Sequence, residues 1–279
     1  MSSDIYPIAP EALIECLDGL GIPAGTSLFT HTAFRQLYRG SVKAAPPQAS
    51  RQYARDLIRA LRGHVGADGV LMMPTEYAGD YQLDAFRKTR FDLRTAPTNR
   101  GFLCSAFLET DGVRRSSGPI YNVTASGPRD FLATLDAHHS LAYSMDKGSP
   151  WWEFMRRGGK IAYIGASLDS NSFIHMPEYV LKQDYPRPVF FGRPHTFYLT
   201  DTTGRNLDVE AYVHAIRWGP LVVTKFCRFL NHKYGILREG RIENTPVIVV
   251  DAKAQYDALM AELELGMSWY DAMTWGEAT

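Results

Sequence analysis

Cysteine is scarce in this sequence: the chain has three among its 279 residues, at Cys16, Cys104 and Cys227. An odd number of widely spaced cysteines, each in an apolar and helix-like context, excludes the dense disulfide framework of small secreted proteins. We therefore expect reduced thiols in the protein interior and a cytoplasmic protein.

Net charge and long apolar runs are missing as well. Thirty Lys and Arg residues balance thirty Asp and Glu residues, which removes the basic surface expected of a nucleic-acid-binding protein. No window approaches the roughly 20 uninterrupted apolar residues of a membrane-spanning helix, and the first residues lack the basic and apolar regions of a signal peptide. The sequence therefore predicts no nucleic-acid partner and no membrane anchor. We also find no internal repeat and no low-complexity segment.

The chain does have an alternation of helical and strand-like apolar patterns, at 45% apolar and 22% charged residues. Helical patterns cover 10–20, 48–61, 102–109, 128–137 with Ser126 as its cap, 149–155, 207–218, 221–233 and 252–265. Strand patterns cover 27–32, 69–75, 160–164, two short pieces of 188–201, and a hairpin of 236–242 with 245–250, while 33–40 is turn-like. These patterns predict an α/β protein. We expect a three-layer helix–sheet–helix sandwich with a central mixed sheet, as a single domain over residues 1–279 with a later antiparallel addition.

A polar loop after the apolar run 160–164 carries the best candidate for an active site. The loop offers helix-capping side chains at 169–172, and Pro177 suits the first turn of the helix that follows. His175 and Glu178, three residues apart, then share one face of this helix. A histidine oriented by a carboxylate outside a strand end is suited to general-base catalysis. The alternative is a histidine that only caps the helix or packs.

Several segments in a fixed order connect this chain to a known family. They are His31-Thr32-Ala33-Phe34, 68–75, 91–97 with Gly101, Arg115-Ser116-Ser117-Gly118-Pro119, 148–150 and 169–178. Their succession resembles the aminoglycoside 3-N-acetyltransferase family, which includes related amino-sugar N-acyltransferases. The resemblance covers roughly residues 21–180 and is weaker over 181–279, as expected of the part that adapts to the acceptor. It implies a single α/β domain, acetyl-CoA or another acyl-CoA as co-substrate without a metal, and direct transfer to an amine in a ternary complex.

The candidate site residues fall into three groups. The resemblance implies that His175 is the catalytic base region, with Glu178 nearby. The cofactor-binding candidates are His31, Thr32, Ala33, Phe34, Arg35, Arg115, Ser116 and Ser149, because the phosphates of coenzyme A need cations or helix N-termini. Arg39 and Lys43 are further cations after the first strand. The substrate-binding candidates are Glu76, Tyr77, Asp80, Tyr121 and Asn122, which supply carboxylates and aromatic rings. Solvated surface charges and core packing are the alternatives for these residues.

Two departures from the family pattern bear on the acceptor. Gly118 stands where the aminoglycoside enzymes usually carry a histidine before the proline, and Asn122 stands where a small hydroxyl residue is usual. Since glycine offers no acid, base or donor, we place a nucleotide-linked amino sugar first as acceptor. An aminoglycoside, with antibiotic resistance as the consequence, is the second choice. A non-catalytic acyl-CoA-binding domain and a thioester hydrolase are the other classes, and a homodimer is left open.

Overall fold

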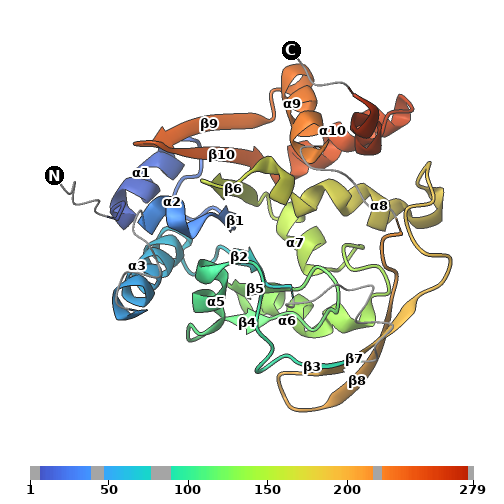
Figure 1. Ribbon diagram of the computed structural model, residues 1–279, viewed down its shortest axis with the longest axis horizontal. Coiled ribbons are helices and arrows are strands. Elements are labelled where there is room, and N and C mark those ends of the chain that lie inside the picture. The colour runs from blue at the N-terminus through green and yellow to red at the C-terminus, as the bar shows by residue number, and fades with distance from the viewer. Residues whose placement is uncertain (1–6, 39–46, 77–88, 216–221, 276–279) are drawn as a thin grey trace.

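The computed structural model describes residues 7–38, 47–76, 89–215 and 222–275. A seven-stranded mixed sheet runs through its middle in the order β4-β5-β2-β1-β6-β10-β9 (Figure 1). The strands are β1 (Leu28–Thr32), β2 (Leu71–Pro74), β4 (Arg114–Arg115), β5 (Val123–Ser126), β6 (Lys160–Ile164), β9 (Leu237–Ile242) and β10 (Thr245–Asp251). The pairs β1–β2 and β1–β6 are parallel, whereas β4, β5, β9 and β10 join by antiparallel pairing. A second, three-stranded sheet consists of β3 (Arg90–Asp92), β7 (His195–Thr200) and β8 (Asn206–Ala211).

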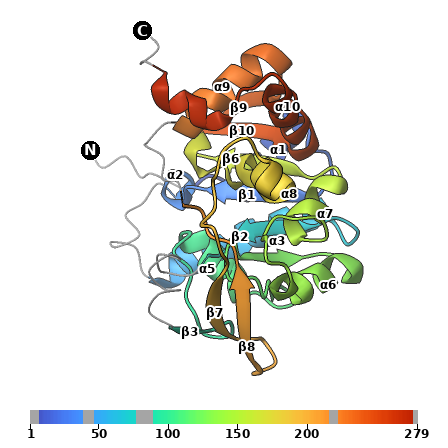
Figure 2. The ribbon, with the colours of Figure 1, turned by 90° about the vertical axis from the view of Figure 1, so that its right-hand side faces the viewer.

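Helices cover both faces of the large sheet. One layer contains α1 (Pro10–Gly19), α2 (Phe34–Tyr38), α3 (Pro47–Val65) and α5 (Phe102–Leu108). The other contains α6 (Arg129–Ala137), α7 (Pro150–Arg156), α8 (Met176–Leu181), α9 (Val222–Tyr234) and α10 (Ala252–Glu264). Figure 2 shows α6, α7 and α8 on the side that faces the viewer. The prediction of an α/β sandwich with a central mixed sheet is confirmed.

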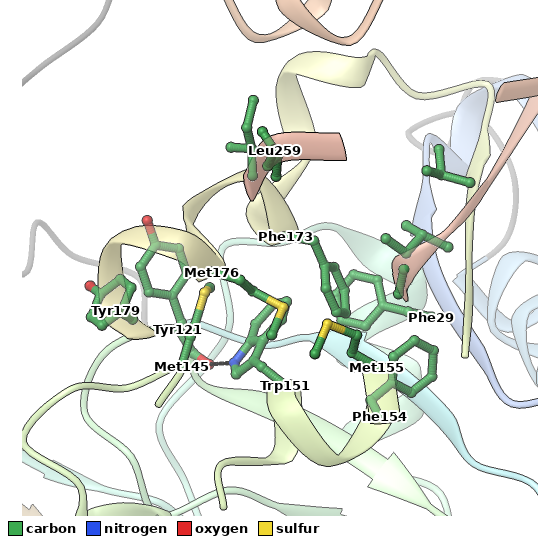
Figure 3. Packing of buried hydrophobic residues seen from close by; sticks show 14 of the residues in the cluster. Phe29, Tyr121, Met145, Trp151, Phe154, Met155, Phe173, Met176, Tyr179 and Leu259 are labelled. Carbon is green, nitrogen blue, oxygen red and sulfur yellow. Dashed lines mark hydrogen bonds between the residues drawn. The ribbon is translucent and has the colours of Figure 1, made fainter. Parts of the chain in front are cut away.

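The alternation of side chains along each strand separates two hydrophobic cores. In β1, Leu28 belongs to the core under α1 and α3, and Phe29 to the core under α7, because successive residues of a strand point to opposite faces. The rings of Trp151 and Phe173 lie 5.2 and 5.3 Å from Phe29 (Figure 3). Trp151 Nε1 also donates to the backbone oxygen of Tyr121 at 2.9 Å, which fastens the loop before β5 to helix α7.

The helix predicted over 207–218 is wrong throughout its described residues: the strand β8 extends to Ala211, and 212–215 are not helical. The exposure of β8 alternates, with Val209 and Ala211 buried between exposed neighbours, and every residue from Asn206 to Ala211 is paired with β7. Residues 216–218 lie outside the described residues. The apolar positions fit a helical period and a strand period equally over this short length, and pairing with β7 decides the outcome.

Smaller differences concern the ends of elements. Residues 188–201 form one strand, β7, plus an isolated bridge between Phe190 and His214, in place of the two predicted strands. Pro128, and not Ser126, precedes α6, without a side-chain cap. The turn-like piece after β1 contains the short helix α2. The three cysteines are free thiols, as expected. Within the described ranges, no helix is both long and apolar enough to span a membrane.

Candidate active site

The candidate site lies beyond the carboxyl edge of the parallel strands β1, β2 and β6, where functional loops of α/β proteins gather. The loop after β6 contains the 3₁₀ turns η2 (Leu168–Ser170) and η3 (Ser172–His175), and η3 runs into α8. Asn171 Oδ1 accepts a hydrogen bond from the backbone N–H of Phe173 at 3.1 Å and so caps η3. The helix α8 itself has His175 at its N-cap position and no side-chain cap, so the predicted cap of this helix is wrong. Asn171 Nδ2 donates to Gln255 Oε1 at 2.9 Å, which fixes this loop to α10.

His175 and Glu178 are in contact, as their spacing predicts. His175 Nδ1 lies 3.1 Å from Glu178 Oε2, and the two residues are only 3% and 0% exposed. Two further groups reach the same carboxylate from distant segments. His214 Nε2 lies 2.5 Å from Oε2, and Trp269 Nε1 donates to Oε1 at 2.6 Å. Three ring nitrogens thus surround a buried carboxylate.

Burial and these contacts set the protonation of the pair. Burial alone would raise the pKa of Glu178, but the charges and hydrogen bonds of His175 and His214 outweigh it and lower the pKa to about 2. Burial lowers the pKa of His175 below 6.5, against the opposing effect of Glu178. At neutral pH the carboxylate is therefore ionised and the imidazole neutral. A neutral ring that donates Nδ1–H to Glu178 keeps a lone pair on Nε2, as a general base requires.

Aromatic rings enclose the pair. The ring of Tyr121 lies 5.5 Å from that of His175, and the rings of His214 and Trp269 lie 4.7 and 5.2 Å away. Tyr121 adopts a positive φ of 50°, and its hydroxyl lies 3.3 Å from His214 Nδ1. Among the substrate-binding candidates, Tyr121 is thus placed directly beside the proposed base.

The predicted loop after β1 lies at the same edge of the sheet. His31 is buried with its ring stacked 5.1 Å from that of Tyr163, and burial, with the charge of Arg100, lowers its pKa to about 3. Thr32 and Ala33 are half-buried, and Ala33 N donates to Ile164 O at 2.9 Å.

The next two cofactor-binding candidates differ in exposure. Phe34 is a core residue that packs on Phe102 with ring centres 4.8 Å apart. Arg35 is exposed. The roles of these loop residues toward coenzyme A remain predictions.

Arg115 and Asn122 bind each other inside the protein. Arg115 is 6% exposed, and its guanidinium donates to Asn122 Oδ1 at 2.8 Å and to the backbone oxygens of Thr75 and Ala96 at 2.7 and 2.5 Å. Asn122 Nδ2 in turn donates to Gly118 O at 3.0 Å. These contacts tie the end of β2 to the loop before β5, so they give both residues a structural role. Their contacts with substrate or coenzyme A remain predictions.

The other predicted residues are distributed around this edge. Ser149 is buried and caps α7, accepting from Trp152 N at 3.1 Å. Ser116 is buried, and its hydroxyl accepts from Val123 N at 3.1 Å. Glu76 is buried and paired with Arg100 at 2.5 Å. The remaining candidates, Tyr77, Asp80, Arg39 and Lys43, lie outside the described residues.

A histidine fills the space beside Gly118. A Cβ atom at Gly118 would lie 2.3 Å from Nδ1 of His138. His138 is 1% exposed, with Nε2 2.7 Å from Ser144 O and Nδ1 3.1 Å from Ser116 Oγ. Burial lowers its pKa to about 4, so the ring is a neutral part of the core. An imidazole from another segment thus occupies the space beside Gly118.

A cavity of about 400 Å³ is lined by Phe190, the residue whose ring packs against His214. The two rings stack with their centres 5.0 Å apart. Tyr143 and Tyr212 form an aromatic wall, and Lys182 adds a cation that pairs with Asp146 at 2.6 Å. A sugar ring or a planar group fits such a volume and lining.

The sequence did not reveal His214, Phe190 or Trp269. His214 belongs to the stretch interpreted as helix, and its bridge with Phe190 depends on the fold of the small sheet. Trp269 lies in η5 (Trp269–Thr274), after the last predicted helix. No local spacing links these residues to Glu178, because they approach it only through tertiary structure.

Comparisons with known proteins agree with this architecture. A family model described as aminoglycoside 3-N-acetyltransferase matches residues 31–264. Aminoglycoside N(3)-acetyltransferase III from Salmonella sp is 33% identical over 197 residues, which cover 66% of this chain and 65% of that protein. The chain thus spans slightly less than two thirds of the length of this relative. Aminoglycoside N(3)-acetyltransferase VIII from Streptomyces fradiae is 25% identical over 291 residues, covering 98% of this chain and 95% of that protein.

A solved structure has the same fold. The structure of AAC-IIIb as a binary complex with coenzyme A superposes with a TM-score of 0.73 at 22% identity, covering 93% of this chain and 97% of that one. The family model extends over most of the sequence and includes the loop of His175 and Glu178. The chain therefore belongs to the aminoglycoside 3-N-acetyltransferase family.

Proposed function

We propose that this protein transfers the acetyl group of acetyl-CoA to an amino group of an aminoglycoside, with His175 as the general base. The observation that carries the proposal is the buried contact between His175 Nδ1 and Glu178 Oε2 at 3.1 Å. The lowered pKa values of both groups favour a neutral imidazole beside an ionised carboxylate. Family membership and the names of the relatives support the aminoglycoside as acceptor. Our first choice from the sequence, a nucleotide-linked amino sugar, is not supported by these relatives.

The proposed step is a direct acyl transfer. The ammonium group of the acceptor first loses one proton to solvent, and the lone pair of the neutral amine then attacks the thioester carbonyl. His175 Nε2 accepts the second proton, which leaves the nitrogen as the C–N bond forms. The C–S bond breaks, and the thiolate of coenzyme A takes up the proton held by His175. Glu178 stabilises the imidazolium while it exists, because the carboxylate stays ionised next to it.

Access to the base is a requirement of this proposal. Only 3% of the surface of His175 is exposed, so side chains around Nε2 must separate when the two substrates bind. Tyr121, whose own φ is positive, contacts the ring of His175. It is our candidate for the side chain that moves to expose Nε2. The solved relative bound to coenzyme A supports acyl-CoA as the donor. We assign the segment from the end of β1 to the start of α2, which contains His31, Thr32, Ala33, Phe34 and Arg35, to the donor side together with Ser116 and Ser149.

The test is thiol release from acetyl-CoA in the presence of a panel of aminoglycosides, with mass spectrometry of the acetylated product. We expect His175→Ala to lose turnover, while His232→Ala, a change at an exposed histidine of α9, keeps it. Full turnover by His175→Ala contradicts the assignment of the base. Binding of acetyl-CoA without turnover on any amine supports the non-catalytic alternative. Release of free acid and thiol without an amine supports the hydrolase.

A further inference from the structure

One carboxylate oxygen in the candidate site serves two histidines. Glu178 Oε2 lies 3.1 Å from His175 Nδ1 and 2.5 Å from His214 Nε2. The second oxygen, Oε1, accepts from Trp269 Nε1 at 2.6 Å. Since Glu178 is 0% exposed, water does not compete for these lone pairs. The rotation of the carboxylate is therefore set by three side chains that come from three separate segments.

His214 is itself held from several sides. Its backbone forms the isolated bridge with Phe190, and the ring of Phe190 stacks on it with ring centres 5.0 Å apart and planes 11° apart. The ring of Tyr179 lies 5.1 Å away, and the hydroxyl of Tyr121 lies 3.3 Å from Nδ1. These contacts fix the ring plane, so its Nε2 is presented to Glu178 in one orientation.

We propose that His214 is a positioning residue: the contact of its Nε2 with Oε2 holds Glu178 in the rotation that keeps His175 Nδ1 bonded and leaves His175 Nε2 as the base. This inference rests on the proposed function. His214 acts through Glu178, because its ring nitrogens are engaged with Glu178 and Tyr121. Without the contact to His214, Glu178 Oε2 keeps only its contact with His175 Nδ1. The carboxylate and the ring of His175 can then rotate together, so His175 Nε2 no longer faces the acceptor amine consistently.

His214 also affects the titration of the base. Its charge lowers the pKa of His175, in the same direction as burial and against Glu178. The other titratable groups around the pair are the phenols of Tyr121, Tyr179, Tyr185 and Tyr270, and burial raises the pKa of Tyr185 and of Tyr270. Removing His214 therefore raises the pKa of His175, because the lowering effect of His214 is lost while the raising effect of Glu178 stays.

Two matched variants separate these effects. In His214→Gln the side-chain amide reaches the position of Nε2 and still donates to Glu178, whereas the shorter amide of His214→Asn reaches only the position of Nδ1. Both remove the ring and its charge. We expect the Asn variant to lose about tenfold to a hundredfold in kcat with little change in KM, and the Gln variant to recover most of this loss. The acidic limb of the pH–rate profile should move to higher pH in both variants.

A control and a second readout make the test decisive. The control variant His64→Gln changes another buried histidine, whose Nε2 lies within hydrogen-bond distance of Ile22 O in the opposite helical layer. We expect this variant to lower the stability of the fold without moving the pH–rate profile. NMR titration of the His175 ring in the resting protein follows the same shift without turnover, so it still reports on His214 if the proposed acceptor is wrong. Equal kcat in the Asn and Gln variants, or an unmoved His175 titration in both, overturns the proposal. If the Asn variant does not fold, His214→Phe, which keeps the packing on Phe190 but donates nothing, replaces it with the same expected results.

Discussion

Replacement of Glu178 by glutamine is the sharpest perturbation of the site. The amide has the shape of the carboxylate but offers one acceptor and one NH₂ donor, whereas the structure presents N–H donors to both oxygens. If the NH₂ faces the histidines, it stabilises the tautomer of His175 with its proton on Nε2, which is no base. If the NH₂ faces Trp269, two donors oppose each other, at a cost of about 1–3 kcal/mol.

The magnitude follows from the depressed pKa. A fall of the Glu178 pKa from 4.5 to about 2 corresponds to at most about 3 kcal/mol of folding free energy. Because the folded-state pKa is lowered, this contribution is fully present above pH 4.5 and is lost as the pH falls toward 2. At neutral pH we expect Glu178→Gln to unfold at lower urea concentration than the parent, and the difference to shrink in acid. We also expect kcat to fall by about a hundredfold or more.

The assay is urea unfolding of the parent and the Glu178→Gln variant at pH 7 and in acid, together with acetyl transfer at pH 7. A variant with the parent's stability at both pH values refutes the account of the buried carboxylate as a charged anchor. Unchanged kcat refutes its role in setting the tautomer of His175, whatever the stability shows.

Two further substitutions test the surroundings of the site. Gly118→Ala places a Cβ 2.3 Å from the buried ring of His138, so we expect the free energy of unfolding to fall by about 1–3 kcal/mol, as measured by thermal unfolding. Its control is Gly63→Ala in α3, which should not destabilise the protein because nothing lies within 4 Å of the added Cβ. Equal stability of the two variants contradicts the packing argument. Arg115→Lys keeps the charge, but lysine cannot reach Asn122, Thr75 and Ala96 together. We expect each lost hydrogen bond to lower the free energy of unfolding by about 1 kcal/mol. A lysine variant as stable as the parent in urea unfolding shows that these three hydrogen bonds do not stabilise the fold.

Local patterns were sufficient for much of the fold. The apolar runs of β1, β2 and β6 predicted strands, and the contact between His175 and Glu178 followed from a separation of three residues. Both features depend on short stretches of chain whose geometry the backbone fixes. The helix α7 with Ser149 as its cap was predictable for the same reason.

Features that depend on distant segments were not predictable. The strand β8 is defined by its pairing with β7, and its own residues fit a helical period over a short length. His214 and Trp269 reach Glu178 across 36 and 91 positions of the chain, so no spacing in the sequence relates them. Arg115 was interpreted from its charge alone, whereas its burial and its internal acceptors became visible only in the fold.

The close approach of His138 to Gly118 links the sizes of two residues that are 20 positions apart. A histidine introduced at 118 would have to share its volume with an imidazole that is already hydrogen-bonded at both nitrogens. Grafting the residue typical of the aminoglycoside enzymes onto this scaffold therefore requires a paired exchange, Gly118→His together with His138→Gly. Related sequences should vary at these two positions in a compensating manner, large at one where the other is small.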